Sequence, residues 1–147
     1  MSSDDWTTAV AVLGLATELV EGIQEGVARR GFGDVRPAHG FAFARISYGD
    51  ATTAKVAEHL GVTKQAGAQL VEYLVHHGYV ERHPDPCDAR ARLLVLTGRG
   101  RACTEAAEAA AVETVDRWRS RVSESAFRQL TATLHVLADQ GRLRPTW

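Results

Sequence analysis

The chain has 147 residues, of which 45% are hydrophobic and 24% charged, as expected for a folded domain with a modest core. Its formal net charge of −1 argues against a protein that coats nucleic acid indiscriminately. Cys87 and Cys103 are too few for a disulfide framework and lack the CxxC spacing of a zinc site, so we expect reduced thiols and no bound metal or other cofactor.

The first predicted helix runs from Thr7 to about Arg30. Its apolar residues recur at steps of three and four and form one stripe, made of Val12, Leu15, Leu19, Ile23 and Val27. Gly14, Gly22 and Gly26 suit a helix that another backbone approaches closely; the alternative is that they are tolerated defects. The acidic start and short apolar run do not fit a secretory signal or a membrane span, so we expect a cytoplasmic protein without a membrane partner.

Three further helices are predicted before residue 80. Residues 37–47 form the first of them, with proline in its first turn. Residues 53–60 form the next, and Gly61 supplies the left-handed turn residue that ends it. Thr63 then caps a helix that ends at Gly78. Two helices joined by so short a turn are typical of a helix-turn-helix.

A hairpin is predicted after this pair of helices. Residues 79–82 and 90–96 favour strands, and residues 83–89 carry the proline and aspartate of a turn. Two more helices follow, one capped by Thr97 and the other opened by Ser123. The last helix has a narrow apolar seam at steps of three and four, made of Phe127, Leu130, Leu134 and Leu137.

Two stretches of the sequence resemble the MarR family of bacterial transcriptional regulators. DARARLLVLTGRG (88–100) resembles that family's wing signature, and LGVTKQAGAQLVEYLVHHGYVER (60–82) resembles its turn and recognition helix. The resemblance implies a mainly α protein with a small two- or three-stranded β wing. It also implies one MarR-type domain over residues 1–147, with the helix-turn-helix at 51–78, the wing at 79–97 and long dimerisation helices at 5–31 and 98–141.

The expected partner is double-stranded DNA with a pseudo-palindromic operator. Side chains at the start of a recognition helix reach base edges in the major groove, which here points to Thr63, Lys64, Gln65, Ala66 and Gln69. By resemblance, Arg90 at the wing tip enters the minor groove, while Asp88 pairs with an arginine and holds the loop in shape. The remaining candidates are expected to contact the DNA backbone: Thr52, Thr53, Lys55, Arg82 and Arg92.

The middle of the chain is mildly basic, since residues 51–101 hold seven Lys and Arg against five Asp and Glu. This supports DNA binding, although a solvated polar face would look similar in isolation. The apolar stripes of the first and last helices exceed what one small core needs, so we expect a homodimer; the alternative is that they complete the monomer's own core.

Family resemblance also implies a pocket for a small aromatic effector that releases a repressor from DNA. The candidates for its lining are His39, Phe41, Phe43 and Arg45. Three other functions stay open: a protein-interaction module without DNA contact, and a metal-sensing or oxidant-sensing winged helix using His76, His77 or Cys87. The sequence lacks GxxxxGK[ST], GxGxxG, HExxH and GxSxG motifs, so we do not expect an enzyme.

Overall fold

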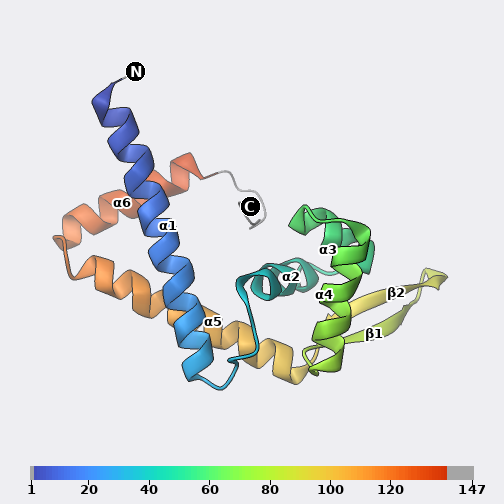
Figure 1. Ribbon diagram of the computed structural model, residues 1–147. Helices are drawn as coiled ribbons and strands as arrows, with labels where there is room; N and C mark the ends of the chain where they lie inside the picture. The colour runs from blue at the N-terminus through green and yellow to red at the C-terminus, as the bar shows by residue number, and fades with distance from the viewer. Residues whose placement is uncertain (1, 139–147) are drawn as a thin grey trace. The chain divides into compact units, whose positions relative to one another are not determined.

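The computed structural model describes residues 2–138, which contain six helices and one two-stranded antiparallel sheet (Figure 1). This content confirms the predicted fold class. The described residues divide into two compact units, residues 2–33 with 106–138 and residues 34–105, and helix α5 (Gly98–Arg119) belongs to both. Residues 139–141 of the predicted terminal helical segment lie outside the described residues.

The first unit contains α1 (Ser3–Arg29), the second half of α5 and α6 (Glu124–Leu137). Helix α1 begins earlier than the predicted Thr7 because a capping box stands in front of it. The Ser2 hydroxyl accepts a hydrogen bond from the backbone N–H of Asp4 at 3.0 Å, and the Asp5 carboxylate accepts one from the Ser2 N–H at 3.3 Å.

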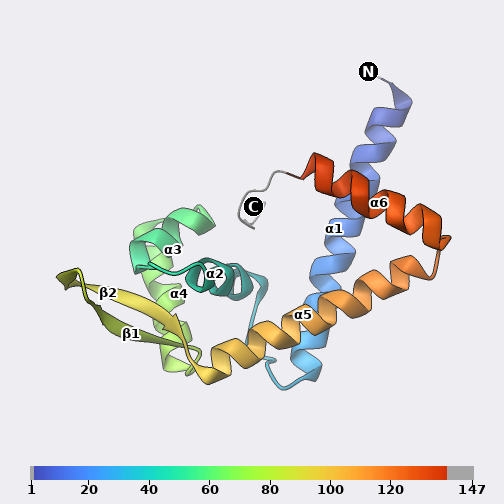
Figure 2. The same ribbon diagram turned by 180° about the vertical axis from the view of Figure 1, so that it is seen from behind.

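Helix α1 packs closely on α5, and both ribbon views show the two helices crossing (Figures 1 and 2). A Cβ atom built on Gly22 would lie 2.2 Å from Thr114 Oγ1, and one built on Gly26 would lie 2.3 Å from Ala110 Cβ. The prediction that glycines mark a close backbone approach is therefore confirmed at these two positions. It is wrong for Gly14, where such an atom would meet nothing within 4 Å.

Much apolar surface in this unit stays exposed. On α1 the predicted stripe is buried at Val27 but 56% exposed at Val12, and Leu13 beside the stripe is 66% exposed. On α6 the seam is buried at Phe127 but is 74% exposed at Leu137. By length and composition α1 is also apolar enough to cross a membrane, although the core helix of a soluble protein and a signal sequence pass the same test.

The second unit carries α2 (Pro37–Ser47), α3 (Thr53–Leu60) and α4 (Lys64–His76), followed by the hairpin of β1 (Val80–Asp85) and β2 (Asp88–Leu96). Gly61 has a φ of +68° and turns the chain between α3 and α4, as expected. All these elements contribute to one core, which includes Phe43, Ile46, Val56, Leu60, Val71, Leu74, Tyr79, Leu94 and Leu96.

The hairpin is longer than predicted. Val80 lies opposite Leu96 and Pro84 opposite Arg92, so the expected turn over 83–89 shrinks to residues 86–87. Pro84 is accommodated because β1 is an outer strand, where a missing N–H need not disrupt pairing. The N–H of Leu94 also donates to the carbonyl of Ala51 at 2.8 Å, which ties the segment before α3 to β2.

Candidate DNA interface

The start of α4 is held so that one side faces the core and the other faces solvent. The Thr63 hydroxyl accepts a hydrogen bond from the N–H of Ala66 at 3.1 Å and caps the helix. Val71 and Leu74 on the inner side are completely buried. The predicted base-reading side chains are all exposed, namely Thr63, Lys64, Gln65, Ala66 and Gln69.

Gly67 makes a close helix–helix contact that was not predicted from the sequence. A Cβ atom on this residue would lie 2.4 Å from the Cβ of Ala57, so α4 rests directly on α3 at this point. A glycine three residues inside an otherwise regular helix was the available signal, because glycine in a helix interior usually costs stability unless it allows a close approach.

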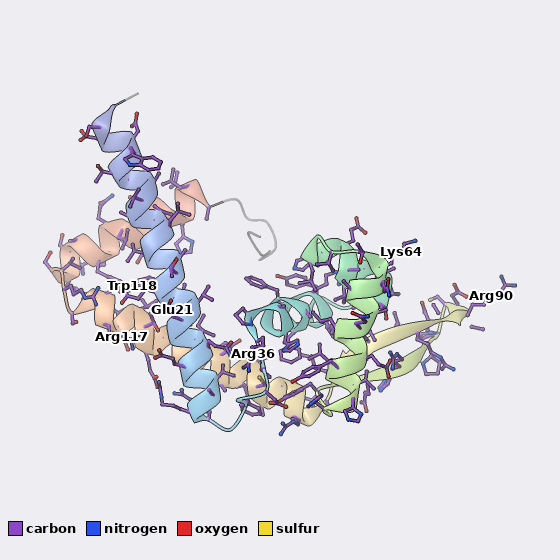
Figure 3. All side chains as sticks on the ribbon, in the orientation of Figure 1. Glu21, Arg36, Lys64, Arg90, Arg117 and Trp118 are labelled. Carbon is purple, nitrogen blue, oxygen red and sulfur yellow. The ribbon has the colours of Figure 1, made fainter. Side chains whose placement is uncertain are left out.

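The wing places Arg90 beside the turn, on β2. Asp85 pairs with Asp88 and Pro84 with Arg92, so residues 89–91 of β2 have no partners on β1 and form a bulge. Figure 3 shows Arg90 near the far end of the hairpin and Lys64 at the start of α4, both extending from the unit. Asp88 accepts a hydrogen bond from the backbone N–H of Arg90 at 2.9 Å, in place of the expected guanidinium. The aspartate thereby shapes the bulge that carries the arginine.

The remaining predicted backbone contacts lie on α3, β1 and β2, with the exposed Arg92 on β2 opposite Pro84. Thr52 is the N-cap of α3, and its hydroxyl accepts from the N–H of Lys55 at 3.2 Å. Thr53, the first residue of α3, is half-buried. The Lys55 ammonium is paired with Asp50, and the Arg82 guanidinium on β1 is paired with Glu72 on α4 at 2.8 Å.

A polar cluster ties α4 and the hairpin to the segment before α2. Tyr79 donates a hydrogen bond to Asp34 Oδ1 at 2.5 Å and accepts one from Arg99 Nη2 at 2.8 Å. The hydrogen bond from Tyr79 lowers the pKa of Asp34, while burial and the nearby carboxylate raise the pKa of Tyr79. Tyr73 on α4 donates to the carbonyl of Asp34 at 2.6 Å. Because both tyrosines bind one residue, helix α4 and the hairpin share an anchor.

The four predicted effector-pocket residues have different surroundings. Phe43 is buried and packs against Tyr79, with ring centroids 5.6 Å apart. Arg45 is 7% exposed and donates to the carbonyl of Gly49 at 3.0 Å, so it stabilises the turn after α2. Phe41 and His39 are half-buried. An open depression of about 400 Å³ in the same unit is lined by other residues, namely 46, 47, 49, 50, 93–96 and 101.

The structure also shows the surroundings of the side chains considered for metal binding or redox chemistry. Residues 2–138 contain no group of three or more His, Cys, Asp or Glu side chains placed to hold a metal ion. Cys87 is exposed in the turn of the wing. Cys103 is buried, and burial raises the pKa of its thiol to about 11, which keeps it protonated near neutral pH.

Comparison with known proteins supports the resemblance of the winged unit to the MarR family. Residues 35–91 match a family model described as the MarR family, a span that includes α2, α3, α4 and the wing as far as the bulge. No curated protein matches the sequence.

Solved structures of several bacterial proteins share the fold. The transcriptional regulator Tm0710 from Thermotoga maritima is 22% identical, with a TM-score of 0.72 over 90% of this chain and 92% of its own. A mutant of MepR from S. aureus bound to an oligodeoxyribonucleotide is 18% identical, with a TM-score of 0.66 over 93% and 96%. The MarR family protein RV2887 from Mycobacterium tuberculosis, in complex with salicylic acid, is 22% identical, with a TM-score of 0.66 over 87% and 93%.

Proposed function

We propose that this chain, whose winged helix-turn-helix belongs to the MarR family, is a sequence-specific double-stranded-DNA-binding transcriptional regulator and not an enzyme. One observation carries the proposal. Within residues 34–105, the exposed start of α4 and the bulge that presents Arg90 are parts of one compact unit with a common core. That unit therefore offers a helix for the major groove and a cationic hairpin for the adjacent minor groove.

The DNA contact proposed for each side chain follows from its chemistry. Gln65 and Gln69 can form paired hydrogen bonds with the edge of adenine, Lys64 can reach guanine or phosphate, and Ala66 can touch a thymine methyl group. Arg90 suits a narrow A·T-rich minor groove, where negative potential is concentrated. The backbone contacts fix the position of the helix and carry no sequence information themselves.

The working form is a homodimer built from the helical ends. The exposed apolar residues of α1 and α6 give the first unit more apolar surface than it buries within one chain, including Trp6, Val10, Leu13, Leu130, Leu134 and Leu137. A two-fold dimer would offer two recognition helices to successive turns of DNA, which matches a pseudo-palindromic operator. As a DNA-binding regulator the protein would act in the cytoplasm.

A small aromatic acid is the proposed effector, which would release the repressor from its operator. The support is the fold shared with RV2887, whose structure contains salicylic acid. Of the four residues predicted to line the site, His39 and Phe41 are better placed than Phe43 and Arg45, because the latter two are buried in the core. Such a ligand would act by favouring a dimer with misaligned recognition helices.

A gel-shift series on the intergenic DNA upstream of the protein's own gene tests the proposal. We expect specific binding that weakens steeply as salt rises, because each phosphate contact releases counterions. Added salicylate should lower the affinity. Absence of binding to any genomic duplex at low salt would favour the alternative of a winged helix that binds proteins.

A further inference from the structure

The basic side chains of the DNA-binding unit differ in whether an acid neutralises them. Residues 34–105 hold nine Lys and Arg against eight Asp and Glu, so the unit is nearly neutral and the pairing of each cation matters. Lys64, Arg90 and Arg92 are exposed and form no ion pair within the described part of the chain. Lys55 and Arg82, in contrast, each bind a carboxylate.

The pair formed by Arg82 joins the wing to the recognition helix. Arg82 Nη2 on β1 lies 2.8 Å from Glu72 Oε2 on α4. The Glu72 side chain is 68% exposed, and it follows Gln69 by three positions, so it lies on the same face of α4 as this candidate base-reading residue. A phosphate would therefore compete with Glu72 for the same guanidinium.

The pair formed by Lys55 is held in place by the backbone. Lys55 Nζ binds the Asp50 carboxylate and lies 3.1 Å from the carbonyl oxygen of Asp50. Asp50 has a φ of +49° and follows Gly49 with a φ of +83°, a turn whose carbonyls accept hydrogen bonds from the buried Arg45. The Lys55 ammonium beside it lowers the pKa of Asp50. This acid is thus charged and held beside Lys55 by a turn that the core supports.

We infer that Glu72 and Asp50 are specificity-determining residues of the DNA interface, because they occupy Arg82 and Lys55 and so weaken binding to DNA of arbitrary sequence. The inference rests on the proposed function. In a non-specific complex the free cations Lys64, Arg90 and Arg92 carry the attraction. On an operator, base contacts seat α4 in the groove and bring phosphates close enough to replace the two carboxylates.

Glu72→Gln and Asp50→Asn test this inference. Both changes keep the size of the side chain, and asparagine tolerates the positive φ of position 50. Affinity for the operator and for a random duplex would be measured by fluorescence anisotropy from 50 to 200 mM salt. Each variant should bind the random duplex more tightly at low salt. Its slope of log affinity against log salt should steepen by about 0.9, which means roughly three- to fourfold more loss over this range.

The matched control is Glu81→Gln. Glu81 neighbours Arg82 in sequence but pairs with His83 at 3.0 Å, so the variant gains the same charge without releasing Arg82 or Lys55. The double variant Glu72→Gln/Arg82→Gln adds a second comparison, because it should lose the gain that Glu72→Gln alone produces. Thermal melts of all variants confirm that each is folded.

The possible outcomes distinguish a failure of this inference from a failure of the proposed DNA-binding function. A larger rise in affinity for the random duplex than for the operator, greater than in Glu81→Gln, would support the inference. If the wild type binds its operator and Glu72→Gln and Asp50→Asn behave like Glu81→Gln, the inference is wrong and the proposed function stands. If the folded wild type binds no DNA at any salt concentration, both are wrong.

Discussion

Arg90 and Gln65 lie on different elements of one unit and differ in what they can recognise. In the proposed DNA complex the guanidinium of Arg90 would respond to phosphate charge and groove width, which vary little with the identity of any single base pair. The amide of Gln65 can match the donor and acceptor pattern of one base edge. The two residues should therefore contribute separately to affinity and to base preference.

Arg90→Ala should weaken binding to every duplex and reduce the salt slope by about 1, whereas Gln65→Ala should relax preference at one operator position by about 1–3 kcal/mol. Binding isotherms on the operator and on single-base variants, repeated at several salt concentrations, provide both quantities. Wild-type behaviour in both variants would refute these two assignments without affecting the fold.

His39, in the first turn of α2, should make the free energy of unfolding depend on pH. The backbone N–H of Arg36 donates to His39 Nδ1 at 2.9 Å, and the ring stacks on Tyr73 with centroids 4.7 Å apart. Burial, followed by the charges of Arg36 and His77, lowers the pKa of His39 below 6.5, against an opposing effect of Asp34. As pH falls below 6.5, the unfolded chain takes up this proton before the folded one does. The free energy of unfolding should therefore fall until the folded pKa is passed.

His39→Gln should remove this contribution, because a glutamine oxygen can still accept from the N–H of Arg36 but does not titrate in this range. Urea denaturation between pH 5 and 7.5 would measure the free energy of unfolding of both proteins. The wild type should lose more stability towards acid than the variant. Parallel pH profiles would show that His39 is not responsible.

At the scale of helices, the contact between α3 and α4 leaves no room for a methyl group. Gly67→Ala would improve helix propensity by about 1 kcal/mol. Its Cβ, however, would lie 2.4 Å from Ala57 Cβ and 3.0 Å from Ala57 Cα, so the helices would have to separate. We expect a net loss of roughly 1–3 kcal/mol in the free energy of unfolding, as is usual for overpacking, together with weaker operator binding.

Gly14→Ala is the natural control for this substitution. Gly14 also lies inside a helix, but a Cβ there would meet nothing within 4 Å. The propensity gain should then remain, and stability should rise by up to about 1 kcal/mol. Chemical denaturation would measure the free energy of unfolding of both variants. An equal effect of the two substitutions would exclude the proposed steric cause.

Features that depend on local chemistry could be predicted from the sequence. Helices α3 and α4 start and end close to the predicted residues because Thr63 caps one helix and Gly61 turns the chain after the other. The early start of α1 was missed, although the capping box of Ser2 and Asp5 is also local. The extra length of the hairpin depends on pairing across β1 and β2, and Pro84 alone looks like a turn residue.

Features that depend on contacts distant in sequence could not be predicted in this way. The candidate DNA-facing residues on α4 and the wing could be predicted because they belong to a short sequence motif. The side chains that hold these elements in place could not be predicted. Glu72 and Arg82 lie on different elements, and Tyr79 and Asp34 are 45 residues apart in the sequence. Burial of Phe43 and Arg45 likewise depends on packing against distant parts of the unit.

At the scale of the whole molecule, the apolar faces of α1 and α6 have a thermodynamic consequence. Trp6, Leu13 and Leu137 are 64%, 66% and 74% exposed in one chain, and large apolar patches of this kind favour association. In the proposed dimer these side chains leave water, and two recognition helices become available for one operator. Association through the helical ends and tight operator binding should therefore be lost together.

Leu13→Asp tests this coupling, because a carboxylate forced into an apolar interface without a partner costs several kcal/mol. Light scattering after size exclusion should show a dimer for the wild type and a monomer for the variant. The variant should also lose operator affinity while its monomer stays folded, since Leu13 is exposed in one chain. Leu13→Met, which preserves apolar volume, should remain dimeric. A dimeric Leu13→Asp variant would exclude this part of α1 from the interface, and a monomeric wild type would exclude the proposed homodimer.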